Sequence, residues 1–209
     1  MKRLLIIIFC CLFVAILAAV AFSVYFPITT TEKVAVDEYE IDLNFDKARK
    51  IIVRCNALQA IVSQQYGEVV TQDWSKLDLQ GIRDWDLEGE GQFVVRFDNL
   101  EIPELLHFVQ KVHITKDRIE SKSGLTGPHG YLKDYVTETE WWRVGEKTAG
   151  RTQVKIVYER RIPANYKSYV EEEVVKAAEK SLKGSHDAIV SLIEQNRNRR
   201  FIGRTVGNQ

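Results

Sequence analysis

The sequence predicts an α+β protein with an N-terminal transmembrane helix, followed by a single antiparallel sheet that a long C-terminal helix covers on one face. Three patterns support this prediction. Leu4 to Phe26 is an uncharged run of almost wholly apolar residues. Between Val34 and Ile162, apolar and polar residues alternate over short segments, which is typical of strands with one packed face. From Asn165 to Asn196, apolar residues recur every three or four positions, the period of an amphipathic helix.

The apolar run from Leu4 to Phe26 is long enough to cross a bilayer, which takes about 20 apolar residues in a helix. Lys2 and Arg3 precede it, and basic residues beside a span stay on the cytoplasmic side. We therefore expect residues 1–26 to be a signal-anchor that places the rest of the chain on the exported (periplasmic or extracellular) side. The alternative is a cleaved secretory signal with Ala19-Val20-Ala21 as its processing site, which would leave the domain secreted.

Beyond the run, the chain divides into a tether at residues 27–33, one domain at 34–196 and a basic flexible tail at 197–209. Without Lys2 and Arg3 the chain has 27 basic and 29 acidic side chains, a formal charge of −2. No global positive field would attract nucleic acid, so nucleic acid is not an expected partner. Cys55 is the only cysteine outside the run, so no disulfide is expected within the domain.

The first half of the domain reads as a strand, a helix and further strands. Val34 to Leu43 alternates as a strand does, and Asn44 is a suitable helix cap. A helical stripe runs from Phe45 to Val62 and includes Cys55, which we expect to be a small buried hydrophobe. The next expected elements are strands at Tyr66 to Asp73 and Leu77 to Leu87, a hairpin turn at Gly89-Glu90-Gly91, and a strand at Gln92 to Phe97.

The second half is predicted to form four strands and the long helix. The helix begins at Asn165 or at the capping box from Ser168 to Glu171, and ends near Asn196. At Gly184 and Ser185 its surface is small, so the helix either approaches the sheet closely there or leaves room beneath it. The expected strands are Leu106 to Thr115, Arg118 to Ser123, Lys133 to Val144 and Arg151 to Ile162, with loops at Gly124 to Gly130 and Gly145 to Gly150.

This order of elements resembles the START-like, or SRPBCC, superfamily, including its polyketide cyclase/dehydrase and lipid transport branch. The resemblance covers about Val34 to Gln195 and rests on diffuse patterns: the strand Val36 to Leu43 running into Phe45 to Ala48, and Val174 to Leu182 in the final helix. It implies a helix-grip fold, in which a curved antiparallel sheet wraps around the long C-terminal helix. The chain departs from the family in its apolar N-terminal run, and in lacking a Pro and a Trp at the start of the first helix.

The resemblance also implies an elongated apolar cavity between the sheet and the helix, for a lipid, sterol, quinone or aromatic molecule. Hydroxyl groups of Tyr135, Thr137, Thr139 and Tyr158 would then supply its few polar contacts. A closed core with these hydroxyls satisfied internally is the alternative. The residues expected to face the cavity are Phe93, Val95, Phe97, Phe108, Val112, Tyr135, Thr137, Thr139, Trp141, Val154, Ile156 and Tyr158.

The sequence contains no pattern that predicts a cofactor, a metal site or a catalytic group. His107, His113 and His129 do not have the spacing of metal ligands. Glu138 and Glu140 share one strand face and could act as an acid and a base, but we expect a solvated pair facing Lys155 and Arg161 on the adjacent strand.

The predicted function is that of a membrane-anchored binding module, which takes up a lipid, a quinone or another apolar small molecule in a cavity between the sheet and the final helix. One alternative is an enzyme of cyclase or hydrolase type that uses the same cavity, with Tyr135, Tyr158 or Arg160 as its reactive groups. A ligand-free interaction scaffold is the other. Neither the ligand nor the oligomeric state follows from the sequence.

Overall fold

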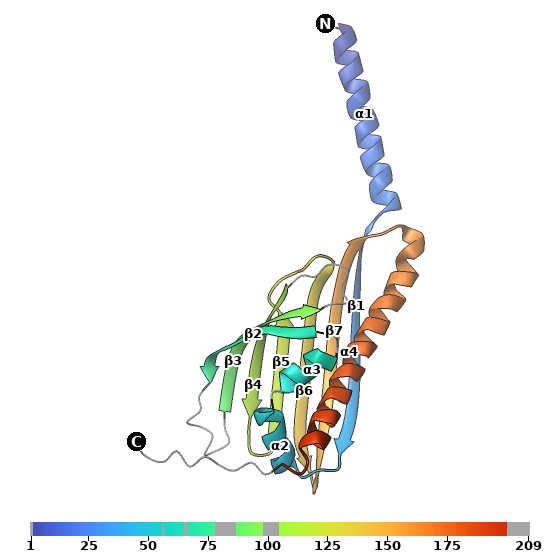
Figure 1. Ribbon diagram of the computed structural model, residues 1–209. Helices are drawn as coiled ribbons and strands as arrows, with labels where there is room; N and C mark the ends of the chain where they lie inside the picture. The colour runs from blue at the N-terminus through green and yellow to red at the C-terminus, as the bar shows by residue number, and fades with distance from the viewer. Residues whose placement is uncertain (1, 56, 65–66, 78–86, 98–104, 200–209) are drawn as a thin grey trace.

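The computed structural model describes residues 2–55, 57–64, 67–77, 87–97 and 105–199. In this part of the chain, one seven-stranded sheet carries helices on one of its faces (Figure 1). The strand order is β1-β7-β6-β5-β4-β3-β2, and every neighbouring pair is antiparallel. The predicted α+β class with a single antiparallel sheet is therefore confirmed.

The elements follow one another largely as the alternation and the helical stripes predict. Apart from the pairing of β1 with β7, all neighbouring strands in the sheet are consecutive along the chain. The elements are α1 (Lys2–Tyr25), β1 (Ile28–Ile41), α2 (Phe45–Arg54), α3 (Ala57–Gln64), β2 (Gly67–Leu77), β3 (Leu87–Phe97), β4 (Leu105–Ile114), β5 (Arg118–Leu125), β6 (Leu132–Val144), β7 (Lys147–Arg161), the 3-10 turn η2 (Ala164–Tyr166) and α4 (Lys167–Asn196).

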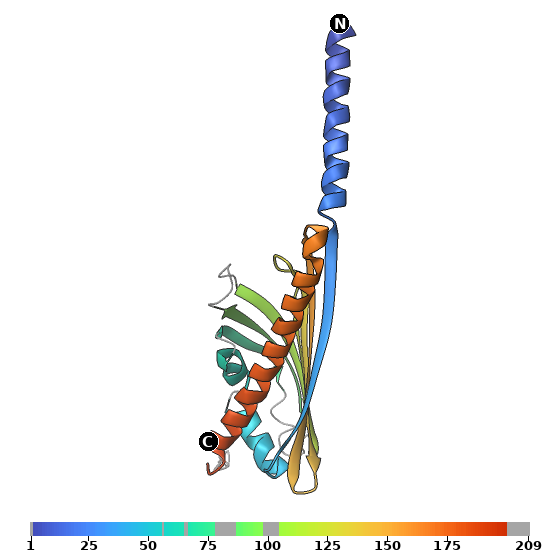
Figure 2. The same ribbon diagram turned by 90° about the vertical axis from the view of Figure 1, so that its right-hand side faces the viewer.

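The long helix α4 lies along the β1–β7 side of the sheet and also contacts α2 and α3 (Figure 2). Its buried residues, which include Val174, Leu182 and Ile189, keep the predicted helical spacing. The predicted capping box from Ser168 to Glu171 is not formed, because η2 runs directly into the helix and places Tyr166 at the N-cap without a side-chain cap.

Helix α2 begins where the sequence predicts, since the Asn44 side chain accepts a hydrogen bond from the Asp46 N–H at 3.0 Å. The predicted stripe is divided between α2 and α3, because α2 ends at Arg54. Arg49 is buried and donates to the carbonyl oxygens of Thr115 and Lys116 at 3.0 and 2.6 Å. Burial lowers the pKa of Arg49, and the nearby Asp46 carboxylate opposes this shift. Arg49 therefore ties α2 to the turn between β4 and β5.

Two segments differ from the prediction. Residues 28–33, predicted as a tether, form the first part of β1 and pair with the end of β7. Gly89-Glu90-Gly91, predicted as a hairpin turn, lies inside β3 and pairs with residues 110–112 of β4. The strand predicted at Leu77 to Leu87 lies mostly at residues 78–86, outside the described residues.

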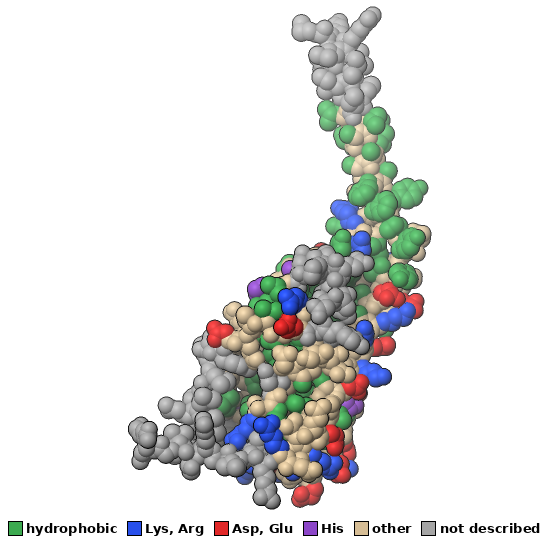
Figure 3. Space-filling view, viewed as in Figure 1, with side chains coloured by type: hydrophobic (Ala, Val, Ile, Leu, Met, Phe, Trp, Pro, Cys, Tyr) green, Lys and Arg blue, Asp and Glu red, His purple; other side chains and the backbone are tan. Residues whose placement is uncertain are grey.

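The N-terminal helix α1 is 24 residues long and stands apart from the sheet (Figures 1 and 2). Hydrophobic side chains cover the described part of its surface (Figure 3), and many of them, such as Leu12, Phe13 and Val24, are more than half exposed. Among the residues whose side chains are described, no helix combines the length and the apolar character needed to cross a membrane.

The C-terminal tail is described only as far as residue 199. Arg197 donates to the carbonyl oxygen of Asp42 at 2.9 Å, and the Nη1 atom of Arg199 lies 3.8 Å from the sulfur of Cys55. Cys55 itself is half-buried at the edge of a hydrophobic cluster, so its expected place in the core is only partly realised. The rest of the predicted flexible tail, residues 200–209, lies outside the described residues.

Candidate functional site

The strand pairing aligns the side chains on the face beneath α4 in rows that cross the sheet. In an antiparallel sheet, directly opposed residues point to the same face. The Trp141 row therefore consists of Leu87, Ile114, Ile119, Trp141, Gly150 and Tyr39. The aromatic row contains Phe93, Phe108, Tyr135 and Ile156. Between them lies the central strip, which we define as Gly89, Gly91, Gln110, Val112, Ser121, Ser123, Thr137 and Thr139.

The Trp141 row is closed by large buried side chains. Ile114, Ile119, Trp141 and Tyr39 belong to one hydrophobic cluster, which also includes Phe45 of α2 and residues of α4. The Trp141 indole N–H donates to the Tyr39 hydroxyl at 2.9 Å. Burial raises the pKa of Tyr39, while hydrogen bonds with Trp141 and Thr152 act in the opposite direction. This end of the covered face is a packed core.

In the aromatic row, Phe93, Phe108 and Ile156 are buried, while Tyr135 is partly exposed. The rings of Phe93 and Phe108 stack with centroids 5.0 Å apart, and Tyr135 meets Phe108 edge-on at 5.9 Å. Val62 of α3 is buried against the two phenylalanines. Ile156 packs with Val154 against α4. Large side chains thus fill the space on both sides of the central strip.

The central strip differs from both rows because its residues are small or polar. Gly89 and Gly91 have no side chain, and Ser121, Ser123, Thr137 and Thr139 have short ones. The partly exposed side chains of the strip are Gln110, Val112, Ser121, Ser123 and Thr137. By contrast Val154, directly opposite Thr137 on the neighbouring strand and packed against α4, is 0% exposed. These five residues of the strip are therefore less buried than the α4 contact beside them.

Polar contacts join α4 to β6 and to β1 beside the strip. The hydroxyl oxygens of Tyr135 and Ser181 are 2.6 Å apart, which joins β6 to α4. His186 of α4 pairs with Asp37 of β1 at 2.8 Å, and its ring stacks on Tyr39 with centroids 4.4 Å apart. These contacts hold α4 against the sheet through hydrogen bonds as well as apolar packing.

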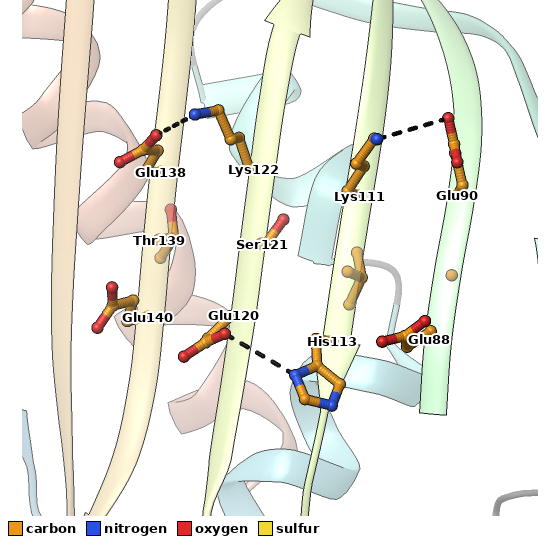
Figure 4. Close-up of a pocket in the computed structure, with 12 residues that line it drawn as sticks. Glu88, Glu90, Lys111, His113, Glu120, Ser121, Lys122, Glu138, Thr139 and Glu140 are labelled. Carbon is orange, nitrogen blue, oxygen red and sulfur yellow. Dashed lines mark ion pairs between the residues drawn. The ribbon is translucent and has the colours of Figure 1, made fainter. Parts of the chain in front are cut away.

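The opposite face of the sheet has an open groove of about 510 Å³ between two rows of charged side chains (Figure 4). In Figure 4 the helices lie behind the strands, so these charged groups point away from α4. Glu138 pairs with Lys122 at 2.5 Å, and Glu140 pairs with Arg118 at 3.3 Å. The Nζ atom of Lys111 lies 4.0 Å from a carboxylate oxygen of Glu90, and the Nδ1 atom of His113 lies 3.8 Å from a carboxylate oxygen of Glu120.

The ion pairs of this groove bear on Glu138 and Glu140, which the sequence predicts as a solvated pair. Neither predicted partner is correct: Lys155 pairs with Glu32 of β1 at 3.2 Å, and Arg161 donates to the carbonyl oxygen of Phe26 at 3.2 Å. The bases that pair with Glu138 and Glu140 come from β5. Exposed pairs of this kind contribute about 0–1 kcal/mol each. The two carboxylates are thus part of a solvated, mutually compensated ladder.

The predicted cavity residues lie on the covered face wherever their side chains are described. Val112, Thr137 and Thr139 belong to the central strip, while Trp141 lies in the Trp141 row. Tyr158 packs at the edge of the Val154 cluster, beside Tyr131. The predicted residues that fill the aromatic end or the α4 contact are Phe93, Val95, Phe108, Tyr135, Val154 and Ile156. The side chain of Phe97 lies outside the described residues.

Several residues of the strip were not predicted. The sequence predicts a turn at Gly89 and Gly91, and the predicted cavity residues do not include Gln110, Ser121 and Ser123. The signal that could have found them is a small residue at every second position, as in Gly89-x-Gly91, Ser121-x-Ser123 and Thr137-x-Thr139.

The guanidinium of Arg160, a residue of the enzyme alternative, is exposed and lies 4.3 Å from the Tyr131 ring centroid. Within the described residues, no three His, Cys, Asp or Glu side chains gather in a way that could hold a metal ion. His107 is exposed on the face opposite α4.

Comparisons with known proteins identify the fold. No protein-family model and no curated protein matches the sequence. Among solved structures, the Zhui aromatase/cyclase from Streptomyces sp. R1128 superposes with a TM-score of 0.52 at 10% identity, over 80% of this chain and 97% of that one. Norcoclaurine synthase from Thalictrum flavum gives 0.42 at 15% identity, over 81% and 91% of the two chains. Ara h 8.0201 gives 0.41 at 10% identity, over 77% and 99%.

The Zhui aromatase/cyclase, whose superposition carries the comparison, is a helix-grip protein of the Bet v 1/SRPBCC type. The chain has the same architecture, a seven-stranded antiparallel sheet packed against a long C-terminal helix. The resemblance predicted from the sequence is therefore confirmed at the level of the fold.

Proposed function

We propose that this chain is a binding module for an apolar small molecule, which lies over the central strip between the sheet and the helices α3 and α4. The observation that supports this most strongly is the contrast across one face of the sheet. Buried large side chains fill the Trp141 row and most of the aromatic row, while the strip between them has mainly glycine, serine and threonine, and five of its eight residues are partly exposed.

This contrast suits a ligand site for a physical reason. Protein interiors are packed as densely as organic crystals, so a strip of missing side-chain volume beneath a covering helix needs another occupant. An apolar molecule placed there gains about 25 cal/mol for each Å² of apolar surface removed from water. Val112 and Tyr135, which are partly exposed, supply apolar surface at the strip and along its border.

The proposal is tested by extracting the purified full-length chain with organic solvent and identifying the recovered compounds by mass spectrometry. We expect an apolar compound in near-stoichiometric amount that survives detergent exchange. A mock preparation of detergent and membrane lipid without the chain is the control. Recovery of the same compounds in the same ratio from the mock preparation would contradict the proposal and favour a ligand-free scaffold.

We further infer that α1 anchors this module to a membrane, with its N-terminus on the cytoplasmic side and the domain on the exported side. The support is the uncharged run from Leu4 to Phe26, the basic residues Lys2 and Arg3 before it, and the exposed apolar side chains along α1. The intact chain is expected in the pellet of alkali-washed membranes. Recovery in the supernatant, or an N-terminus beginning after Ala21, would instead indicate a secreted domain.

A further inference from the structure

Exposed tyrosines gather at the end of the domain that adjoins α1. Ile28, the first residue of β1, pairs with Arg161 at the end of β7, and the Tyr131 carbonyl oxygen accepts from the Glu159 N–H at 2.9 Å. The start of α4 follows β7 through η2, so it lies at the same end (Figures 1 and 2). The tyrosines are Tyr131, Tyr166 and Tyr169, which are 45%, 55% and 61% exposed. Their rings have an apolar body and a polar tip, which suits a boundary between water and an apolar phase.

Basic side chains lie among these tyrosines. The segments 126–131 and 160–169 contain three basic residues and no aspartate or glutamate, a formal charge of +3: Arg160, Arg161 and Lys167. All three are exposed, and Figure 3 shows Lys and Arg side chains beside hydrophobic ones where α1 meets the domain. Arg160 lies over a tyrosine ring, and Lys167 is 3.9 Å from Glu171 in an exposed pair. Because exposed pairs are weak, the Lys167 ammonium remains available to a stronger anionic partner.

Arg161 connects this end of the domain to the last turn of α1. Its Nη1 atom donates to the Phe26 carbonyl oxygen at 3.2 Å, and its guanidinium carbon lies 5.9 Å from the Phe22 ring centroid. Phe26 is the last residue of the uncharged run that we propose to cross the bilayer. Since a helix rises about 1.5 Å per residue, the guanidinium lies within about one turn of the point where α1 would leave the hydrocarbon. Lipid phosphate groups are found at that level, and they pair well with guanidinium groups.

Given the proposed anchoring by α1, on which this step rests, we infer that this end of the domain lies against anionic lipid headgroups. The three basic side chains contact lipid phosphates, and the three tyrosine rings lie at the headgroup level, where amphipathic aromatic side chains are favoured. Only Phe26 and Pro27 separate α1 from β1, so the end reaches the bilayer surface without a long tether. The contact holds the domain in one orientation on the membrane.

The test reconstitutes the full chain into vesicles of phosphatidylcholine alone, or of phosphatidylcholine and phosphatidylglycerol in equal parts. Both contain a trace of phosphatidylethanolamine with a photoreactive diazirine on its headgroup. After irradiation, cleavage after glutamate releases residues 121–138 and 160–171 as separate peptides, and mass spectrometry measures the labelled fraction of each. We expect at least about threefold more labelling of both peptides in the anionic vesicles, because each basic residue near an anionic surface favours contact about fivefold until the end is fully seated.

Charge-removing variants locate the contact. Arg160→Gln combined with Lys167→Gln removes two positive charges and leaves Arg161 in place, and it is expected to lose most of the excess labelling in anionic vesicles. Lys147→Gln combined with Arg151→Gln is the matched control, because it removes one lysine and one arginine charge from the other end of β7. This control should keep the excess labelling of the wild type. Neither pair of substitutions changes the cleavage sites, and thermal unfolding checks that each variant is folded.

The outcomes separate this inference from the proposed anchoring. Equal labelling of the two peptides in both kinds of vesicle would overturn the inference, because a domain that is merely tethered by α1 stays near the bilayer whatever the lipid charge. An unchanged excess in the variant with Arg160→Gln and Lys167→Gln would overturn the assigned contacts. A second probe, with its diazirine on an acyl chain, tests the anchor itself. It should label the peptide 1–32 in both kinds of vesicle, and no labelling there would contradict the anchoring by α1.

Discussion

Replacing Phe45 with alanine is expected to lower the free energy of unfolding by about 3–5 kcal/mol, the usual cost of truncating a buried phenylalanine. The ring is 0% exposed and lies in the cluster that joins α2 to the Trp141 row and to α4. The guanidinium carbons of Arg49 and Arg143 lie 5.6 and 5.7 Å from its centroid, so the cavity would also remove packing beside a buried cation. Urea unfolding of the full chain, followed by tryptophan fluorescence, measures the change.

Val53→Ala is the control for this substitution because it lies on the same helix and its side chain is 48% exposed. Its expected effect is within about 0.5 kcal/mol, as for other surface changes. If Phe45→Ala destabilised the chain no more than Val53→Ala does, the packing of α2 against the sheet and α4 would be wrong.

Placing phenylalanine at two opposed positions of the sheet is expected to destabilise the chain to different extents. Val154 and Thr137 face each other across β7 and β6 and share the covered face. Val154 is 0% exposed beneath α4, so Val154→Phe overfills a closed core. It should lower the free energy of unfolding by about 1–3 kcal/mol. Thr137 is partly exposed in the central strip, so Thr137→Phe places its ring where there is room.

For Thr137→Phe we expect the free energy of unfolding to fall by less than about 1 kcal/mol, since phenylalanine suits a half-buried strand position. The two substitutions introduce the same ring on adjacent strands, so each is a control for the other. Urea unfolding midpoints of both variants are compared with the wild type. Equal destabilisation by the two variants would mean that the strip is packed as tightly as the α4 contact.

Most of the fold could be predicted because the apolar residues of most elements recur with the spacing of a strand or of a helix. Alternation located β4, β5, β6 and β7 to within a few residues, and the spacing of apolar residues located α4. The errors arose where pairing overrides local signals. Residues 28–33 are rich in threonine, which is compatible with a tether or a strand, and pairing with β7 makes them a strand. Gly89 and Gly91 have the composition of a turn, but β4 holds them in β3.

The candidate site was only partly predictable for a different reason. Alternation within one strand shows which residues share a face, but not which residues of other strands lie beside them. The strip exists only because the register aligns Gly91 with Gln110, Ser123 and Thr137. The partners of Glu138 and Glu140 were wrong for the same reason. The register places Lys122 of β5 opposite Glu138, while Arg151 of β7, opposite Glu140, pairs with Glu38 of β1.

The most direct test is the amount of apolar compound extracted from Thr137→Phe, relative to the wild-type chain, at equal concentrations of folded protein. If a ligand occupies the space over the central strip, the new ring should displace it and lower the recovered amount to roughly a tenth of the wild-type value or less, which at a nearly full site requires more than a tenfold loss of affinity. Recovery equal to that of the wild type from a folded Thr137→Phe chain would contradict a ligand site between the sheet and the helices.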